Sequence, residues 1–249
     1  MARIIISIIF FISGCCGLGY EIIWSRELQL VLGHTTYSIT AVLTAFMSGL
    51  AAGSYFIGKF IDHSKSPITL YAYLEFGIGI YGIIFFHLLK LHDFFYLYIA
   101  HSLTNSAVDF FVKFALAFAL MILPTTLMGA TFPAMSKILM KNLKSKGMEI
   151  GVIYFLNSAG GAFGCLITGF FLIEYFGNEF ASNIISIFNI LCGISALIAR
   201  KYITLQPPDD QLSADTDNAI SAPESANYKT TADNKYLQDI SNPMLNIAL

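Results

Sequence analysis

The chain contains six apolar stretches that are each long enough to cross a membrane as a helix. They cover residues 4–24, 37–58, 68–89, 110–135, 150–173 and 181–199. A helix needs about 20 mostly apolar residues to cross the hydrocarbon core of a bilayer. Backbone polar groups find no water in that core, so a spanning segment must satisfy them internally, as a helix does. We therefore predict an all-α membrane protein of six transmembrane helices.

The composition supports this class and excludes another. Of the 249 residues, 56% are hydrophobic and 12% are charged, whereas soluble domains are about 25% charged. The net charge is −2, and no nucleic-acid-binding motif is present. Nucleic acid is therefore not an expected partner. The expected partner is the lipid bilayer.

The first stretch has an alternative interpretation as a lipoprotein signal. Residues Ile12 to Cys15 resemble a lipoprotein cleavage site and follow a basic start at Arg3. The apolar run continues past Cys15 to Ile23, and further spans follow, so a membrane helix is favoured.

Cysteines occur only inside apolar runs, and three histidines, His87, His92 and His101, are irregularly spaced. Neither pattern predicts a metal or a cofactor.

Lysine and arginine predict the orientation of the chain. Six crossings put both termini on one side, and nine basic residues of the connections fall on that side against three on the other. Basic residues favour the cytoplasmic side, so we expect a multi-pass protein of the cell (inner) membrane with both termini in the cytoplasm. Residues 1–202 form the predicted membrane domain. Residues 203–249 have the polar, aromatic-poor composition of a disordered cytoplasmic tail.

Glycines in two stretches share one spacing. Gly49, Gly53 and Gly58 are separated by four and then five residues, and the same steps separate Gly160, Gly164 and Gly169. Small residues let membrane helices approach closely, so all six are predicted to pack helices. If the match is not chance, the second of the first three helices is equivalent to the second of the last three. We call each set of three helices a triplet. The two triplets are then inverted repeats, as in one six-helix half of a major-facilitator transporter.

The segment after the second stretch resembles a major-facilitator signature. In that superfamily a glycine between helices two and three is followed four residues later by an aspartate and then by basic residues, as Gly58 is here by Asp62. Asp62 is the expected gating-loop residue. His63 replaces the usual arginine and no Gly-Arg pair follows, so the gating contacts of the superfamily are not carried over.

Several segments together resemble a narrower family, the membrane domain of the fused spermidine synthase-like proteins. The resemblance covers residues 13–199, and its most distinctive part is the block Leu123 to Pro133. Its other matching positions include Ser13-Gly14, Tyr20-Glu21-Ile22, Trp24, Arg26, Tyr71, Glu75, Tyr154 and Asn157. In that family a cytoplasmic domain similar to polyamine aminopropyltransferases follows the membrane part. Fewer than fifty residues follow Arg200 here, without a Gly-rich nucleotide-binding turn, so the resemblance implies no enzymology for this chain.

Ionisable and polar residues within the stretches are the predicted solute contacts. Glu75 comes first, because it lies about eight residues, or roughly 12 Å, into the third stretch, and an ionisable group at that depth indicates a functional site. Pro124 and Pro133 predict a kinked or broken fourth helix beside Thr125. The predicted substrate-binding residues are Glu75, Glu21, Arg26, Tyr71, Asn157 and Thr125. For each of them a structural role remains the alternative.

Two functions stay open at this point. One is a transporter-like or solute-binding module for a small cationic or amphipathic solute such as a polyamine, with Glu75 as its counter-charge. The polyamine rests on the resemblance alone. The other is a non-catalytic membrane anchor or partner of a separate cytoplasmic aminopropyltransferase-like protein. A third function, a membrane enzyme in its own right, is not favoured, because the sequence contains no nucleophile with a matching base and no metal-binding constellation. A six-helix transporter would need to form a homo-oligomer.

Overall fold

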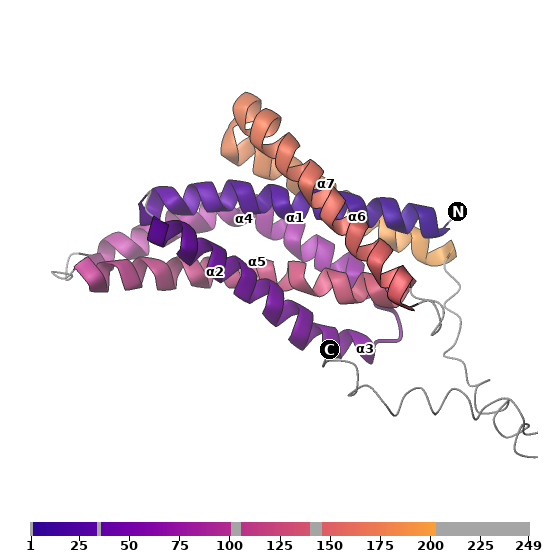
Figure 1. Ribbon diagram of the computed structural model, residues 1–249. Helices are drawn as coiled ribbons and strands as arrows, with labels where there is room; N and C mark the ends of the chain where they lie inside the picture. The colour runs from indigo at the N-terminus through magenta and orange to yellow at the C-terminus, as the bar shows by residue number, and fades with distance from the viewer. Residues whose placement is uncertain (1, 34–35, 101–105, 140–145, 203–249) are drawn as a thin grey trace, which may run out of the picture. The chain divides into compact units, whose positions relative to one another are not determined.

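The computed structural model describes residues 2–33, 36–100, 106–139 and 146–202, and every element in this part of the chain is a helix (Figure 1). The predicted tail lies outside the described residues. The elements are α1 (Ala2–Leu32), α2 (Thr36–Ala52), a π-helical turn (Gly53–Ile57), α3 (Gly58–Asp62), α4 (Pro67–Ala100), α5 (Ser106–Leu139), α6 (Lys146–Ile167), a second π-helical turn (Thr168–Leu172), α7 (Ile173–Ala199) and a 3₁₀ turn (Arg200–Tyr202).

Five helical segments are long and apolar enough to cross a membrane. They are Ile4–Leu32, Thr36–Ile61, Pro67–Tyr96, Val108–Leu139 and Glu149–Ala199. The last has 51 residues, more than twice the length of one crossing. It reverses at Gly177, where φ is +76° and ψ is 170°, a conformation that glycine adopts at low cost. The sequence predicts a short turn around Gly177 and Asn178, between the apolar stretches 150–173 and 181–199, and this reversal confirms it.

Two predicted element boundaries are wrong. The mixed composition of residues 90–108 predicts a loop, with room for a short interfacial helix, but α4 continues to Ala100 and α5 begins at Ser106. Contacts between the two helices stabilise the added turns, because the Tyr96 hydroxyl donates to the Asp109 carboxylate at 2.6 Å. Asp109 also pairs with Lys113 at 3.0 Å, one turn along the same helix, as the spacing predicts.

The sequence predicts a kinked or broken fourth helix, and α5 is not broken, because it continues through Pro124 and Pro133. Proline has no N–H, so Pro124 leaves the carbonyl of Leu120, four residues earlier, without its helical partner. The Tyr81 hydroxyl on α4 donates a hydrogen bond to that carbonyl. A neighbouring helix thus satisfies the freed group, which is one way in which membrane helices tolerate proline.

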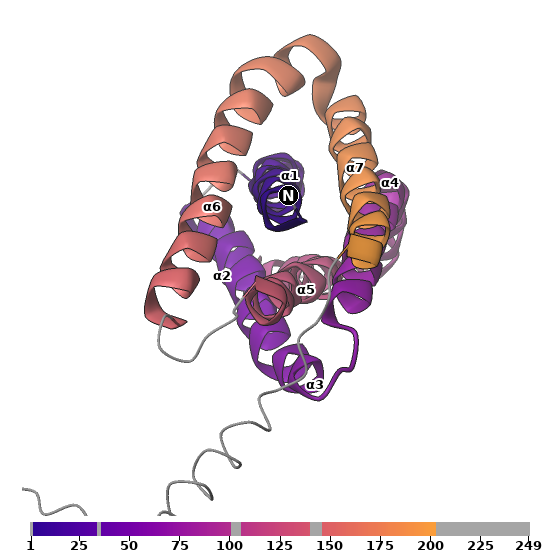
Figure 2. The same ribbon diagram turned by 90° about the vertical axis from the view of Figure 1, so that its right-hand side faces the viewer.

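The helices form two similar groups that pack against each other. In Figure 2, α1 lies between α6 and α7, and α5 lies between α2 and α4, in agreement with the main helix contacts. Helices α4 and α7 also pack together. The buried side chains form two apolar clusters, one around Trp24 and Phe85 and the other around Phe10 and Tyr71.

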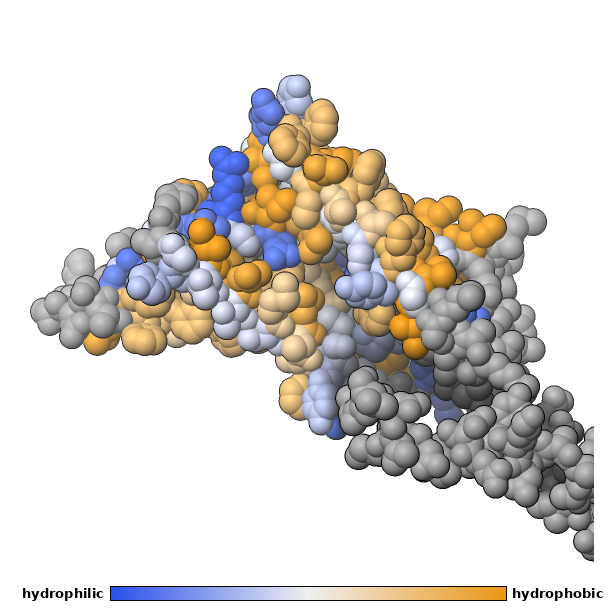
Figure 3. Space-filling view, viewed as in Figure 1, coloured by the Kyte–Doolittle hydropathy of each residue, from blue (hydrophilic) through white to orange (hydrophobic). Residues whose placement is uncertain are grey.

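Trp24 belongs to this interior and not to an interfacial belt, which corrects the position expected from its place at the end of the first stretch. Its side chain is 0% exposed and stacks on Tyr20 and Phe85, with ring centroids 4.6 and 4.8 Å apart. The reason is that α1 continues eight residues beyond Trp24, to Leu32. Exposed apolar side chains, Phe155 and Ile187 among them, lie instead on the outer surface. Hydrophobic residues, in orange, cover much of the face shown in Figure 3. This surface suits contact with lipid.

Glycines give α2 and α6 their close contacts. A Cβ atom added at Gly53 would collide with the backbone of Thr126 on α5, and one added at Gly164 would collide with the backbone of Cys15 on α1. A Cβ atom added at Gly58 would make only ordinary van der Waals contact with the side chain of Pro133, at 3.6 Å. Gly169 differs from the prediction, because a Cβ there would meet nothing within 4 Å in the described part of the chain.

These close contacts repeat along the chain at a constant shift of 111 residues. The shift takes Gly49 to Gly160 and Gly53 to Gly164, and it also relates the residues that they face. Three pairs of contacts correspond: Gly49 to Ile122 with Gly160 to Phe11, Gly53 to Thr126 with Gly164 to Cys15, and Gly129 to Leu50 with Leu18 to Gly161. At these three pairs of positions, the packing of α2 and the following π-helical turn on α5 matches the packing of α6 on α1.

Candidate functional site

A cavity of about 330 Å³ lies where the two groups of helices meet. Helices α1, α2, α4, α5, α6 and α7 all contribute to its walls. The lining residues are Ser13, Gly14, Gly17, Leu18, Phe46, Leu50, Ile78, Met128, Thr131, Tyr154, Asn157, Ser158 and Asn189. Its volume is at the small end of the range for ligand pockets.

A buried carboxylate lies directly behind this lining. The side chain of Glu75 is 0% exposed. Its Oε1 accepts a hydrogen bond from the Ser13 hydroxyl at 2.5 Å, and its Oε2 accepts one from the Asn189 amide at 2.6 Å. Both donors line the cavity. Glu75 therefore acts on the cavity through Ser13 and Asn189, which it holds in place.

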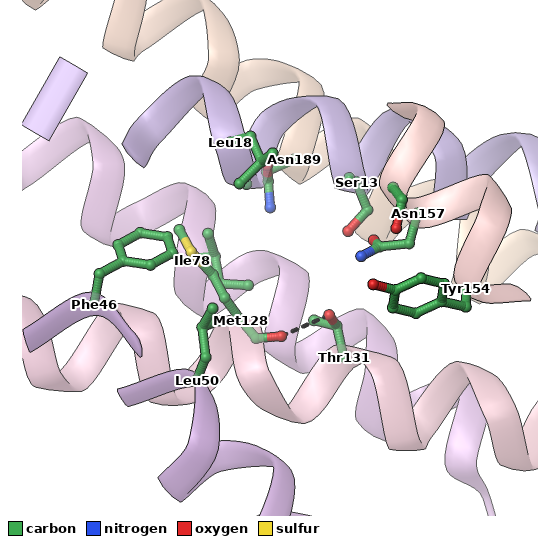
Figure 4. A pocket seen from close by; sticks show the side chains of 13 residues that line it. Ser13, Leu18, Phe46, Leu50, Ile78, Met128, Thr131, Tyr154, Asn157 and Asn189 are labelled. Carbon is green, nitrogen blue, oxygen red and sulfur yellow. Dashed lines mark hydrogen bonds between the residues drawn. The ribbon is translucent and has the colours of Figure 1, made fainter. Parts of the chain in front are cut away.

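The cavity has one apolar and one polar wall. Figure 4 shows Phe46, Leu50, Ile78 and Met128 on one side, and Ser13, Thr131, Tyr154 and Asn157 on the other. The Thr131 hydroxyl donates to the carbonyl of Met128 on its own helix, at 2.7 Å. The lining includes no lysine, arginine or histidine.

The 111-residue shift relates the two walls. It takes Phe46 to Asn157 and Ile78 to Asn189, and all four residues line the cavity. Equivalent positions thus carry an apolar side chain in the first triplet and an amide in the second. The packing contacts are alike in the two triplets, whereas the chemistry of the cavity wall is not.

The cavity opens at the surface on the side of α6. Tyr154 lines it and is nevertheless 64% exposed, and the neighbouring lining residue Ser158 is exposed as well. Ser158 lies nine residues, or roughly 13 Å, from the start of the apolar segment at Glu149. Tyr154 lies five residues, or roughly 7.5 Å, from Glu149, so the exposed lining residues extend from the early part of this segment toward the middle of α6.

The predicted solute contacts fall into two sets. Asn157 lines the cavity and Glu75 lies one side chain behind it. Tyr71 is fully buried one turn before Glu75 and packs edge-on against Phe10. Thr125 is also fully buried, but its hydroxyl donates to the carbonyl of Met121 on its own helix, at 2.6 Å, and it does not line the cavity.

The remaining candidates lie away from the cavity. Glu21 is half-buried and Arg26 is exposed on the later part of α1, and neither lines the cavity. Asp62 is the last residue of α3, and its side chain lies outside the described residues. Beside it, the Lys137 ammonium donates to the carbonyls of Ile61 and Ser64 at 2.9 and 3.1 Å. A basic group from α5 thus holds the C-terminal end of α3.

Sequence reasoning missed five polar residues of the cavity: Ser13, Thr131, Tyr154, Ser158 and Asn189. One signal could have found Asn189: it is an amide inside an apolar stretch, and the glycine repeat pairs it with Ile78. Ser13 carries no such signal, since single serines are common in membrane helices. In the described part of the chain, no group of three or more histidine, cysteine, aspartate or glutamate side chains could hold a metal ion.

Comparison with protein-family models, with curated proteins and with solved structures found no match to this chain.

Proposed function

We propose that this integral membrane protein binds a small organic cation in the cavity, with Glu75 as the counter-charge. The observation that carries the proposal is the hydrogen bonding of one buried carboxylate to two cavity residues, Ser13 and Asn189. Ionisable groups inside membrane segments are costly and usually functional. Because no basic side chain lines the cavity, the nearest charge for a ligand is negative.

We further propose that the chain crosses the membrane six times, as two inverted triplets with a major-facilitator-like arrangement. The turn at Gly177, within a segment of 51 residues, supports two crossings there. The contacts that repeat after 111 residues support the equivalence of the triplets. A ligand site at the interface of inverted repeats is typical of transporters, and we propose a transporter-like role on this basis. The kinship with fused spermidine synthase-like membrane domains stays a prediction.

Binding of amines to the purified protein in lipid nanodiscs tests the proposal. The probes are putrescine, spermidine and n-hexylamine, because together they vary charge and apolar length. We expect saturable binding of at least one probe, and we expect Glu75→Gln to weaken it at least tenfold. Glutamine keeps the shape of the side chain and one acceptor oxygen, but it removes the negative charge and puts an amino group where the second acceptor oxygen was.

Glu21→Gln is the matched control, since Glu21 is another acid within a membrane segment but does not line the cavity. It should leave binding unchanged. If no probe binds to the folded wild-type protein, or if both variants behave alike, the organic-cation proposal is wrong. The alternative of a membrane partner for a cytoplasmic enzyme would then be the one to pursue.

A further inference from the structure

The polar and apolar walls of the cavity differ at positions that the repeat makes equivalent. Asn157 lies on the polar side and its equivalent Phe46 on the apolar side, whereas Asn189 lies between the two sides, beside Leu18, and its equivalent Ile78 lies on the apolar side (Figure 4). A ligand with a charge at each end would place one of its charges against Phe46 and Ile78. That arrangement would remove the charge from water without supplying a polar partner, which is costly.

We propose that the ligand is an amphipathic monoamine, with one ammonium group and one apolar tail, and not a polyamine. This inference rests on the proposed function, because it assigns a substrate class to the same cavity. The ammonium group lies toward Ser13 and Asn189, in front of Glu75. The tail packs against Phe46, Ile78 and Met128, where burial of each methylene group contributes to affinity.

The side opening of the cavity suits such a ligand. Tyr154 and Ser158 line the cavity and are exposed on α6, within a membrane-spanning segment. An amphipathic amine dissolves in the bilayer with its tail among the lipid chains. It therefore reaches the opening from the membrane, whereas a polyamine, with charges along its length, does not.

The test compares n-hexylamine with the diamine 1,6-diaminohexane, which has the same carbon chain and a second amino group. Binding of both amines is measured by calorimetry on protein in nanodiscs, with empty nanodiscs subtracted to remove partitioning into lipid. We expect wild-type protein to bind the monoamine at least tenfold more tightly than the diamine.

Exchange of wall residues across the repeat sharpens the test. Phe46→Asn gives the apolar wall the amide of its equivalent, Asn157, and should reduce the preference for the monoamine at least fivefold. Phe155→Asn is the matched control, because Phe155 is an exposed phenylalanine of α6 that does not line the cavity. That variant should keep the wild-type preference.

Three outcomes separate the two proposals. If wild-type protein prefers the diamine, or if Phe46→Asn leaves the preference unchanged in a folded protein, the assignment to monoamines is wrong but the organic-cation site stands. If neither amine binds and the polyamines also fail to bind, both proposals are wrong. Thermal unfolding of each variant verifies that it is folded.

Discussion

Glycine is the residue on which the close packing of α2 with α5 depends. A Cβ atom at Gly53 would collide with the carbonyl group of Thr126, and a helix backbone cannot move aside locally. We predict that Gly53→Ala destabilises the protein by about 1–3 kcal/mol, as overpacking does in dense interiors. The measurement is the thermal unfolding temperature in detergent, which should fall.

Gly169→Ala is the comparison for this prediction, because the same methyl group would there meet nothing within 4 Å in the described residues. Its unfolding temperature should stay equal to that of the wild type or rise slightly, since alanine favours the helix over glycine. Equal losses in the two variants would mean that the cost reflects glycine in general and not the contact with Thr126.

Helix α5 depends on its neighbour α4 at the position of Pro124. The Tyr81 hydroxyl is the partner of the Leu120 carbonyl, which Pro124 leaves without a backbone donor. We predict that Tyr81→Phe lowers the stability by about 1–3 kcal/mol, the usual cost of an unsatisfied buried polar group. Tyr73→Phe on the same helix, with an exposed ring, should have little effect.

A double-mutant cycle decides whether Pro124 is the cause. Pro124→Ala restores an N–H that can bond to the Leu120 carbonyl, so Tyr81→Phe should cost less in that background. Unfolding temperatures or denaturation free energies of the four proteins give the coupling. Independent, additive effects would show that the cost of removing the Tyr81 hydroxyl does not depend on Pro124.

At the scale of elements, apolar length and glycine spacing predict much of this fold. The long helices, the turn at Gly177 and five of the six glycine contacts follow from rules that act within one helix or between two. The ends of α4 and α5 and the continuity of α5 could not be predicted in this way. They depend on Tyr96 and Tyr81, whose partners lie on another helix.

The candidate site was harder to predict because it belongs to the whole molecule. Depth in the membrane selects Glu75, and the sequence also indicates Asn157. The cavity between them exists only after six helices have packed, and its walls come from residues as distant as Ser13 and Asn189. To predict that the cavity has a polar and an apolar wall, one would need to know both the repeat and the three-dimensional arrangement of the helices. Single residues such as Phe46 carry no sign of it.

The arrangement of the whole molecule in the membrane gives the last prediction. The segment Glu149–Ala199 would be about 76 Å long if it were one straight helix, far more than a bilayer core needs. Because it reverses at Gly177, Glu179 should lie on the opposite side of the membrane from Lys201. The distribution of basic residues near the ends of the spans predicts that Lys201 and Lys65 lie on the cytoplasmic side.

Single cysteines at these three exposed positions test this topology. They are introduced with Cys15 and Cys165 replaced by serine, since those two are the less buried native cysteines. In intact cells a membrane-impermeant maleimide should label Glu179→Cys, and it should label Lys65→Cys and Lys201→Cys only after permeabilisation. Labelling of Glu179→Cys and Lys201→Cys from the same side would mean that this segment does not cross twice. The two triplets could not then be inverted repeats, and the shift of 111 residues would describe helix packing alone.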